Sequence, residues 1–323
     1  MSSPPATAPV PPRGLFARLG ECVRERRLPY AVARAFTSQV AGRVHRPLLG
    51  ALLRIGAKRK PRPVSLERAR ELHRRYPIRD GYKYDLAAKE ERAASRLDEL
   101  TGLVDLTRVR DVAEVGAGDG RLAIQLLGRG FRPCILDAAD WRDDDVRAAG
   151  IPFHQLHGSG DYPLPNNSVD LVLAYNTMEH ISDPPAALRE MIRITRPGGR
   201  IYLSFCPIHN SPWGLHAYGT YYAPYPQFLL APGDLEAFVA ENGINDLGVD
   251  RAAFQYVNGY AAADYRRLVT DVAGVATCER FHTTRDLDHL GLVYRHLPSF
   301  WGRGLSFDEL TTDSVQVLLA KKG

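Results

Sequence analysis

The sequence predicts an α/β fold in which a doubly wound, mostly parallel sheet of seven strands carries helices on both faces. Three observations lead to this prediction. From Val109 onward, short apolar runs alternate with stretches of helical periodicity, as parallel strands joined by crossover helices require. A glycine-rich turn, 116–120, follows the first apolar run. A helical N-terminal extension precedes the sheet, and an aromatic insertion, 207–230, follows the fifth run.

Composition limits the functional classes. The chain has 323 residues, enough for one large core and some appendages. Its four cysteines, Cys22, Cys134, Cys206 and Cys278, are far apart, which disfavours a disulfide framework or a zinc knuckle and predicts a reducing, cytoplasmic location. No apolar run reaches the ~20 residues that span a bilayer. The first residues lack the basic-then-apolar order of a secretory signal.

Charge is unevenly distributed along the chain. Residues 1–62 hold 13 Lys and Arg against 2 Asp and Glu, whereas acidic side chains outnumber basic ones in the remainder. Three interpretations of this segment are open: a solvated tail, contact of residues 14–62 with an anionic membrane surface, and nucleic-acid binding. Few aromatic residues accompany the charges, which disfavours nucleic acid. The membrane interpretation would place a cytoplasmic protein peripherally on the inner face of the membrane.

The chain divides into three predicted parts. Residues 1–62 are a basic segment, partly disordered or amphipathic, and residues 63–105 are a helical extension. Residues 106–323 are a sheet domain, which contains the aromatic insertion 207–230. Ser65 is a plausible N-cap for a helix through Arg75, and a second helix is expected over 85–100. The expected strands are 111–115, 133–137, 151–156, 169–175, 200–206, 277–281 and 314–319. The expected helices of the sheet domain are 120–128, 142–148, 183–194, 234–241 and 261–272.

The turn after the first strand reads Glu114-x-Gly116-x-Gly118-x-Gly120. A strand, a glycine turn and a helix in this order place bare backbone N–H groups and a helix N-terminus beside a ligand. The dinucleotide fingerprint would need a glycine where Arg121 stands. The spacing therefore favours a ligand other than a dinucleotide.

Three further motifs follow in order: an apolar run that ends in Asp137, the proline-flanked Asp161 to Asp170, and a Pro-Gly-Gly turn at 197–199. With the glycine turn, they make residues 109–205 resemble the class I methyltransferases that use S-adenosylmethionine (SAM), of the type 11-like kind that includes glycan and natural-product O-methyltransferases. The resemblance implies a Rossmann-like fold, SAM as cofactor, Asp137 on the ribose diol and Asp161 near the adenine amino group. The implied cofactor-binding residues are Glu114, Gly116, Ala117, Gly118, Gly120, Asp137, Ala138, Asp161, Tyr162 and Asn176.

Methyl transfer to a hydroxyl needs a general base, and histidine is the usual choice. His180 follows the fourth strand in a Glu-His pair that resembles one found in many family members. His216 and His209 lie in the aromatic insertion, which we interpret as a lid over a small-molecule, sugar or glycolipid acceptor. The alternative interpretations are that these histidines serve packing or face solvent, and that the insertion is a packed flap or a dimer contact.

Other interpretations remain open from the sequence. They are C- or N-methylation of a natural product, an NAD-dependent oxidoreductase and a non-catalytic SAM-fold binding protein. The Asp183-Pro184-Pro185 run matches a helix start rather than the motif of amino-methylating enzymes on nucleic acid. No metal site is predicted, because the carboxylate run 143–145 is expected to be solvated. The sequence fixes neither the acceptor nor the oligomeric state.

Overall fold

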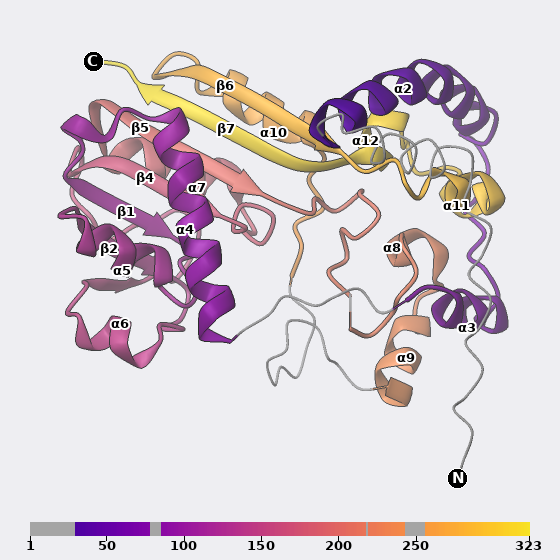
Figure 1. The fold of residues 1–323 in the computed structure, drawn as a ribbon. Coiled ribbons are helices and arrows are strands. Elements are labelled where there is room, and N and C mark those ends of the chain that lie inside the picture. Colours follow the sequence, from indigo (N-terminus) through magenta and orange to yellow (C-terminus); the bar gives the residue numbers. More distant parts are fainter. Residues whose placement is uncertain (1–29, 78–84, 218, 243–255) are drawn as a thin grey trace, which may run out of the picture.

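The computed structural model describes residues 30–77, 85–217, 219–242 and 256–323. Its seven strands form one sheet with the order β3-β2-β1-β4-β5-β7-β6 (Figure 1). The strands are β1 (Asp111–Val115), β2 (Arg132–Asp137), β3 (Phe153–Gln155), β4 (Val169–Tyr175), β5 (Thr195–Phe205), β6 (Ala276–Arg285) and β7 (Thr312–Lys321). The first five are parallel, and β7 runs antiparallel to both β5 and β6. The predicted doubly wound, mostly parallel sheet is confirmed.

Successive side chains of a strand point to opposite faces of the sheet, so each face carries its own hydrophobic cluster and its own layer of helices. On β1, Val112 packs with α4 (Leu86–Leu103) and α5 (Arg121–Gly128), whereas Ala113 packs in the cluster that contains α7 (Pro184–Ile194) and α10 (Ala262–Asp271). α6 (Asp144–Ala148) and the short helix η1 (Leu106–Arg108) complete this part. The α7 start is as predicted: Asp183 caps the helix by accepting from the Ala186 N–H.

A second hydrophobic core lies beyond the carboxyl ends of the parallel strands (Figure 1). It is built from three parts of the chain: an N-terminal part, the aromatic insertion with the helix that follows it, and the connection between β6 and β7. Its helices are α2 (Tyr30–Ile55), α3 (Leu66–Arg75), α8 (Pro226–Leu229), α9 (Asp234–Asn242), α11 (Leu290–Arg295), η3 (Leu297–Phe300) and α12 (Phe307–Thr311). Its largest buried rings include Tyr221, Tyr225, Phe238, Phe300 and Phe307.

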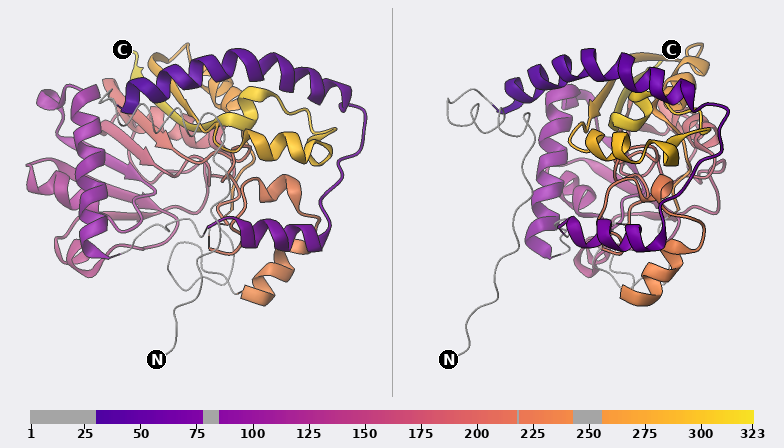
Figure 2. Two further views of the ribbon diagram at one scale, coloured as in Figure 1. Left: turned by 45° about the vertical axis from the view of Figure 1, so that its right-hand side comes forward. Right: turned by 90° about the vertical axis from the view of Figure 1, so that its right-hand side faces the viewer.

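α2 belongs to this second core along its C-terminal half. Leu49 and Leu53 are buried in it, whereas Val44, Leu48 and Ile55 are exposed. Figure 2 shows α2, in indigo, running along the outside of the molecule over the yellow C-terminal helices. In the described residues, no helix is long and apolar enough to span a membrane. The part of the predicted amphipathic region before residue 30 lies outside the described residues.

The segment between α2 and α3 is packed against the rest of the molecule. The Arg59 guanidinium lies 4.7 Å from the centre of the Trp301 ring, and the Arg62 N–H donates to the Pro298 carbonyl at 3.0 Å. The predicted N-cap is present, since Ser65 accepts from the Arg68 N–H. The core of the molecule therefore continues across residue 62.

Ion pairs fix α5 against its neighbours. Arg121 is almost fully buried and pairs with Glu90, Asp143 and Asp145 at 3.2, 2.8 and 2.5 Å. Lys89 pairs with Asp143 at 2.7 Å. The expectation that the run 143–145 is solvated was wrong for Asp143, which is partly buried between Arg121 and Lys89, whereas Asp145 pairs with Arg121 and stays exposed.

Two adjacent leucines test the packing of α2. Leu49 is 0% exposed and Leu48 is 50% exposed. We expect Leu49→Ala to lower the free energy of unfolding by about 2–5 kcal/mol, as truncation of a buried leucine does. Leu48→Ala should change it by less than about 0.5 kcal/mol. Urea denaturation measures both, and equal effects would contradict the packing of α2 described above.

Candidate active site

The glycine turn that follows β1 is left-handed at three positions. Gly116, Gly118 and Gly120 have φ of 69°, 57° and 75°, a region that favours glycine. A Cβ at Gly116 would lie 2.3 Å from Thr177 Oγ1, so that glycine permits a close contact between the turn and the end of β4. A Cβ at Gly118 would meet nothing within 4 Å. The turn therefore opens onto free space at Gly118.

Asp137, at the end of β2, closes the turn from the other side. Its Oδ2 accepts from the Gly118 N–H at 3.1 Å, and its Oδ1 accepts from the Ala138 N–H at 2.7 Å. Burial raises the pKa of this carboxyl. Because each carboxylate oxygen can accept two hydrogen bonds, Asp137 retains acceptor capacity for the two hydroxyls of a ribose.

Glu114 lies beneath the turn and is 1% exposed. Burial raises the pKa of its carboxyl to about 8. Its Oε2 accepts no hydrogen bond from the described residues. An orphaned buried oxygen, the open space at Gly118 and the acceptors of Asp137 fit SAM, which carries an amino group and a ribose diol.

The remaining predicted cofactor residues occupy different environments. Ala117 is buried in the turn and Ala138 is exposed after β2. Asn176 is exposed directly after β4 with φ of 49°. Asp161 is exposed, whereas the Tyr162 ring is buried in the main core. Tyr162 is anchored there by its backbone, since its N–H donates to Glu190. Only Asp161 of this pair has its side chain at the surface.

Thr177 is a site residue that the sequence reasoning missed. Its Oγ1 lies 3.1 Å from the Val115 carbonyl oxygen and 3.0 Å from that of Tyr175. The hydroxyl thereby ties the end of β1 to the end of β4. The signal was local: a small hydroxyl residue immediately after Asn176, at the end of the strand beside the glycine turn.

Beyond the end of β4, the structure brings together two of the three predicted histidines with an acidic neighbour. The rings of His180 and His216 have centroids 4.9 Å apart in an edge-to-face arrangement. Glu179 Oε1 lies 3.9 Å from His180 Nε2. One ring nitrogen of each histidine and one oxygen of Glu179 all lie within 4.8 Å of one another. We call these three residues the Glu-His-His cluster.

Both rings of the cluster are oriented by backbone carbonyls. His180 Nδ1 lies 2.6 Å from the Tyr256 carbonyl oxygen, and His216 Nε2 lies 2.9 Å from that of Pro207. A carbonyl oxygen can only accept, so these nitrogens donate, and the other nitrogen of each neutral ring carries a lone pair. His216 is held with φ of 57°, an uncommon conformation for a residue other than glycine.

Glu179 is 1% exposed, and burial raises the pKa of its carboxyl to about 8. The N–H groups of Glu179 and Cys206 lie near enough to offset this increase in part. Neither carboxylate oxygen meets hydrogen-bond geometry with a described residue. The cluster therefore contains a buried acid without a conventional partner.

His209 lies apart from the cluster. Its ring packs edge-on against Phe228, with centroids 6.4 Å apart, and burial lowers its pKa. The Gln227 side chain donates to the His209 carbonyl at 2.7 Å. These contacts favour the alternative interpretation of His209 as a packing residue.

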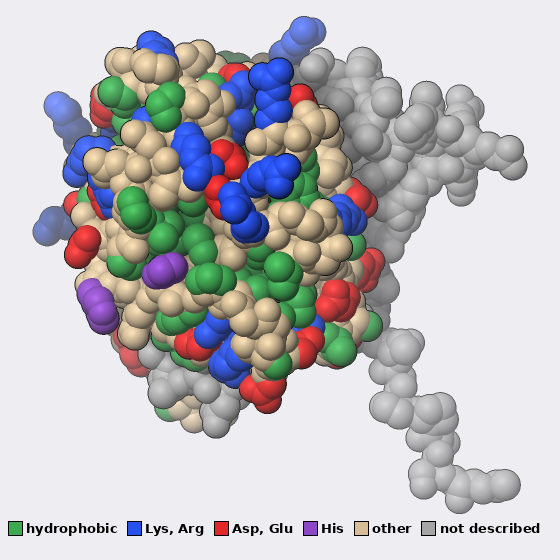
Figure 3. All heavy atoms as spheres, turned by 90° about the vertical axis from the view of Figure 1, so that its left-hand side faces the viewer, with side chains coloured by type: hydrophobic (Ala, Val, Ile, Leu, Met, Phe, Trp, Pro, Cys, Tyr) green, Lys and Arg blue, Asp and Glu red, His purple; other side chains and the backbone are tan. Residues whose placement is uncertain are grey.

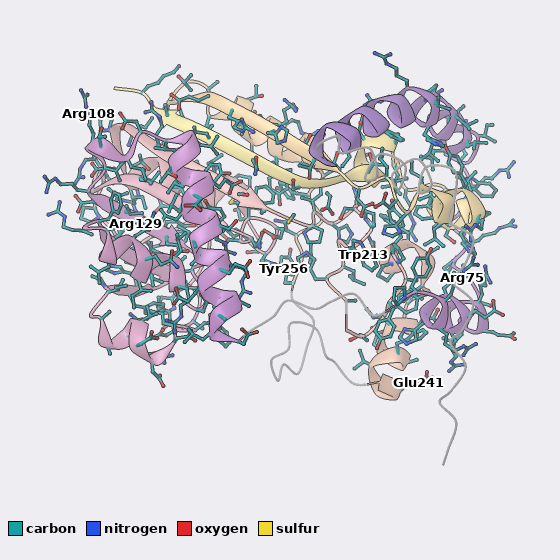
Figure 4. The ribbon with its side chains drawn as sticks, viewed as in Figure 1. Arg75, Arg108, Arg129, Trp213, Glu241 and Tyr256 are labelled. Atoms are coloured by element: carbon teal, nitrogen blue, oxygen red, sulfur yellow. The ribbon has the colours of Figure 1, made fainter. Side chains whose placement is uncertain are left out.

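Most aromatic rings of the insertion are used in packing. The Tyr221 hydroxyl donates to the Ala69 carbonyl, and the Tyr225 hydroxyl donates to the Leu310 carbonyl. The sticks in Figure 4 place Trp213 and Tyr256 between the sheet and the helices of the second core. The insertion thus anchors the segment that carries His216, instead of presenting a row of open ring faces.

Comparisons with known proteins agree with this geometry. A family model described as a methyltransferase domain matches residues 113–203. A malonyl-[acyl-carrier protein] O-methyltransferase of Serratia marcescens is 33% identical over 122 residues, which cover 38% of this chain and 47% of that relative. A 27-O-demethylrifamycin SV methyltransferase of Amycolatopsis mediterranei is 23% identical over 256 residues, 76% of this chain and 89% of that one. This chain thus spans about half the length of the first relative.

Among solved structures, a SAM-dependent methyltransferase of Methanosarcina mazei has 13% identity and a TM-score of 0.45, with 69% of this chain and 97% of that chain covered.

Asp137 and Gly118 test the cofactor pocket. Asp137→Ala should weaken SAM binding by about 1.5–3 kcal/mol through the loss of charge-assisted hydrogen bonds. Asp140 is an exposed neighbour that pairs with Arg142, and Asp140→Ala should leave the affinity for SAM unchanged. Calorimetry with SAM measures both, and equal affinities of folded Asp137→Ala and wild type would contradict the ribose assignment.

Gly118→Val should abolish SAM binding by filling the open space beside the turn. Gly130→Val is the matched control, because Gly130 also has a positive φ and no neighbour within 4 Å, but follows the far end of α5. If both variants lost SAM binding alike, backbone strain would be the cause and the pocket would not lie at Gly118.

Proposed function

Because this chain belongs to the class I SAM-dependent methyltransferases, we propose that it methylates an oxygen atom of a small-molecule, sugar, glycan-linked or lipid-linked acceptor. The observation that carries the proposal is the Glu-His-His cluster. An alcohol is a weak nucleophile until it loses its proton, and acid–base side chains beside the acceptor serve that step. A neutral amine already carries a nucleophilic lone pair and needs less help, so the cluster favours oxygen over nitrogen.

In the proposed mechanism, one half of the site binds the methyl donor and the other half activates the acceptor. SAM supplies an electrophilic methyl group on a sulfonium when it is bound. The glycine turn, Glu114 and Asp137 orient the donor, and the second core excludes water from the acceptor side. A lone pair of His180 or His216 accepts the acceptor's proton, and Tyr256 and Pro207 hold the two rings in the tautomer that this requires.

The relatives support oxygen as the methylated atom. The names of both the Serratia and the Amycolatopsis protein describe methylation at oxygen. Incubation of the purified protein with radiolabelled SAM and cell extracts would identify the acceptor. Label recovered only on carbon or nitrogen would contradict the proposal.

The face of the molecule at the amino-terminal ends of the parallel strands, opposite the candidate site, does not have the charge pattern of a nucleic-acid surface. On the face that Figure 3 shows, Lys and Arg side chains are interspersed with Asp and Glu. This face therefore lacks the continuous positive surface that binds a phosphate backbone.

A membrane contact is a further part of the proposal, and it lies on α2. Val44, Leu48 and Ile55 are exposed on one side of this helix, at spacings that put them on one stripe. Arg43 and Arg54 are exposed beside them. An apolar stripe with flanking arginines suits the surface of an anionic bilayer.

The histidines of the cluster are the test of the catalytic proposal. Alanine at whichever of His180 and His216 accepts the proton should lower turnover by about 10²–10⁴-fold, the usual weight of general-base catalysis. SAM affinity should be nearly unchanged, because the donor contacts lie elsewhere. His282→Ala, on an exposed residue of β6, is the control. Near-wild-type turnover of both cluster variants, where chemistry limits the rate, would contradict this role.

The membrane contact predicts cosedimentation with anionic vesicles at low salt, where electrostatic attraction is strongest, and little with zwitterionic vesicles. Replacing both Leu48 and Ile55 with Asn should reduce it severalfold. Leu127→Asn is the control, because Leu127 is an exposed leucine on α5. A full-length protein that ignores anionic vesicles at low salt would rule this contact out.

A further inference from the structure

The Glu-His-His cluster has the composition of a metal site as well as that of an acid–base pair. We propose that Glu179, His180 and His216 together bind one divalent transition-metal ion, to which the acceptor oxygen coordinates. Their ligand atoms lie within 4.8 Å of one another, and Glu179 Oε1 and His180 Nε2 are 3.9 Å apart. Bonds of about 2.0–2.2 Å to an ion require a modest further approach, which side-chain rotation supplies.

Glu179 is the first argument for an ion. It is 1% exposed, and neither of its oxygens has a hydrogen-bond partner of good geometry among the described residues. Buried carboxylates in proteins are paired, hydrogen-bonded or bound to a metal. His180 Nε2 lies 3.9 Å from Glu179 Oε1, which is beyond hydrogen-bond distance. A cation between the two would satisfy the carboxylate.

The orientation of the two rings is the second, independent argument. Metal-ligating histidines almost always donate their outer N–H to a carboxylate, a carbonyl or water, which fixes the tautomer and aims the lone pair. His180 donates to the Tyr256 carbonyl and His216 to the Pro207 carbonyl. His216 also keeps a left-handed backbone conformation in a buried position, which places its ring edge-on to His180.

The ligand types indicate the kind of ion. Two imidazoles and one carboxylate suit Zn²⁺, Co²⁺, Fe²⁺ or Mn²⁺ better than Mg²⁺ or Ca²⁺, which prefer oxygen. Three protein ligands leave positions open for an exogenous oxygen. The cluster lies just beyond β4 and β5, where ligands of open α/β sheets bind.

The consequence for catalysis rests on the proposed methylation of oxygen, whereas the binding of the ion does not. A hydroxyl bound to the ion loses its proton to solvent more readily than a free alcohol does. The oxygen then forms the new bond to the methyl carbon, the carbon–sulfur bond breaks, and its electron pair stays on sulfur. In this form of the site, the histidine lone pairs hold the ion instead of the proton.

The competing explanation is a charged histidine that pairs with Glu179 without a metal. Titration of chelator-treated, full-length protein separates the two. Co²⁺ binding is followed by visible absorption and Zn²⁺ binding by calorimetry. We expect one equivalent of each to bind.

Glu179→Gln, which preserves shape, and His216→Ala should lower the affinity for Co²⁺ at least about 10–100-fold, the range that loss of even an outer-shell partner causes. His282→Ala controls for adventitious surface binding and should bind like wild type. SAM affinity, which depends on the glycine turn, should stay unchanged in all variants and shows that each is folded. Absence of binding to wild type, or equal binding by wild type and Glu179→Gln, would overturn the metal site.

Turnover distinguishes this inference from the proposed function. Full methyl transfer to oxygen by the chelator-treated enzyme would overturn the ion's catalytic role and leave the histidine base in place. Stoichiometric metal binding with label transferred only to carbon or nitrogen would preserve the site and overturn O-methylation. Turnover that is lost with chelator and restored by Zn²⁺ or Mn²⁺ would support both.

Discussion

The contact between Thr177 and the backbone of Gly116 holds the two halves of the site together. A Cβ at Gly116 would lie 2.3 Å from Thr177 Oγ1, so the glycine turn and the end of β4 can meet this closely only without a side chain there. The segment that contains Thr177 continues directly into Glu179 and His180. The glycine turn and the proposed acceptor groups are therefore fixed to one another through a few residues of backbone, and in the proposed mechanism the in-line geometry of methyl transfer depends on this short connection.

The second core supplies what the sheet alone lacks. The parallel strands position the glycine turn, Asp137 and the Glu179–His180 pair, but His216 comes from a segment that the sheet does not hold. Its place is set by the insertion, which α3 and α12 anchor through the Tyr221 and Tyr225 hydroxyls. Packing in the second core thus determines whether the Glu-His-His cluster is complete.

Local pattern predicted the sheet closely. The strand expected at 169–175 is β4 as observed, and the helix expected after Ser65 ends at Arg75. The donor motifs occupy the strand ends where parallel topology must place them. The contact between His216 and His180 could not be predicted from the sequence, because it depends on packing between segments that lie far apart in the chain. The partners of Arg121 were missed for the same reason, since a carboxylate run reads as solvated until the buried cation opposite it is known.

The connection between β6 and β7 begins and ends at one place in the sheet, with Arg285 paired to Thr312. The residues between them form α11, η3 and α12 and contribute much of the second core. Because entropy penalises a longer closed loop only weakly, such a segment can be lengthened, shortened or exchanged while the strands at its base keep their register. Sequence changes in the connection between β6 and β7 and in the aromatic insertion can thus alter the proposed acceptor side and leave the donor side unchanged. An engineer who grafts acceptor specificity between relatives would cut at these same two junctions.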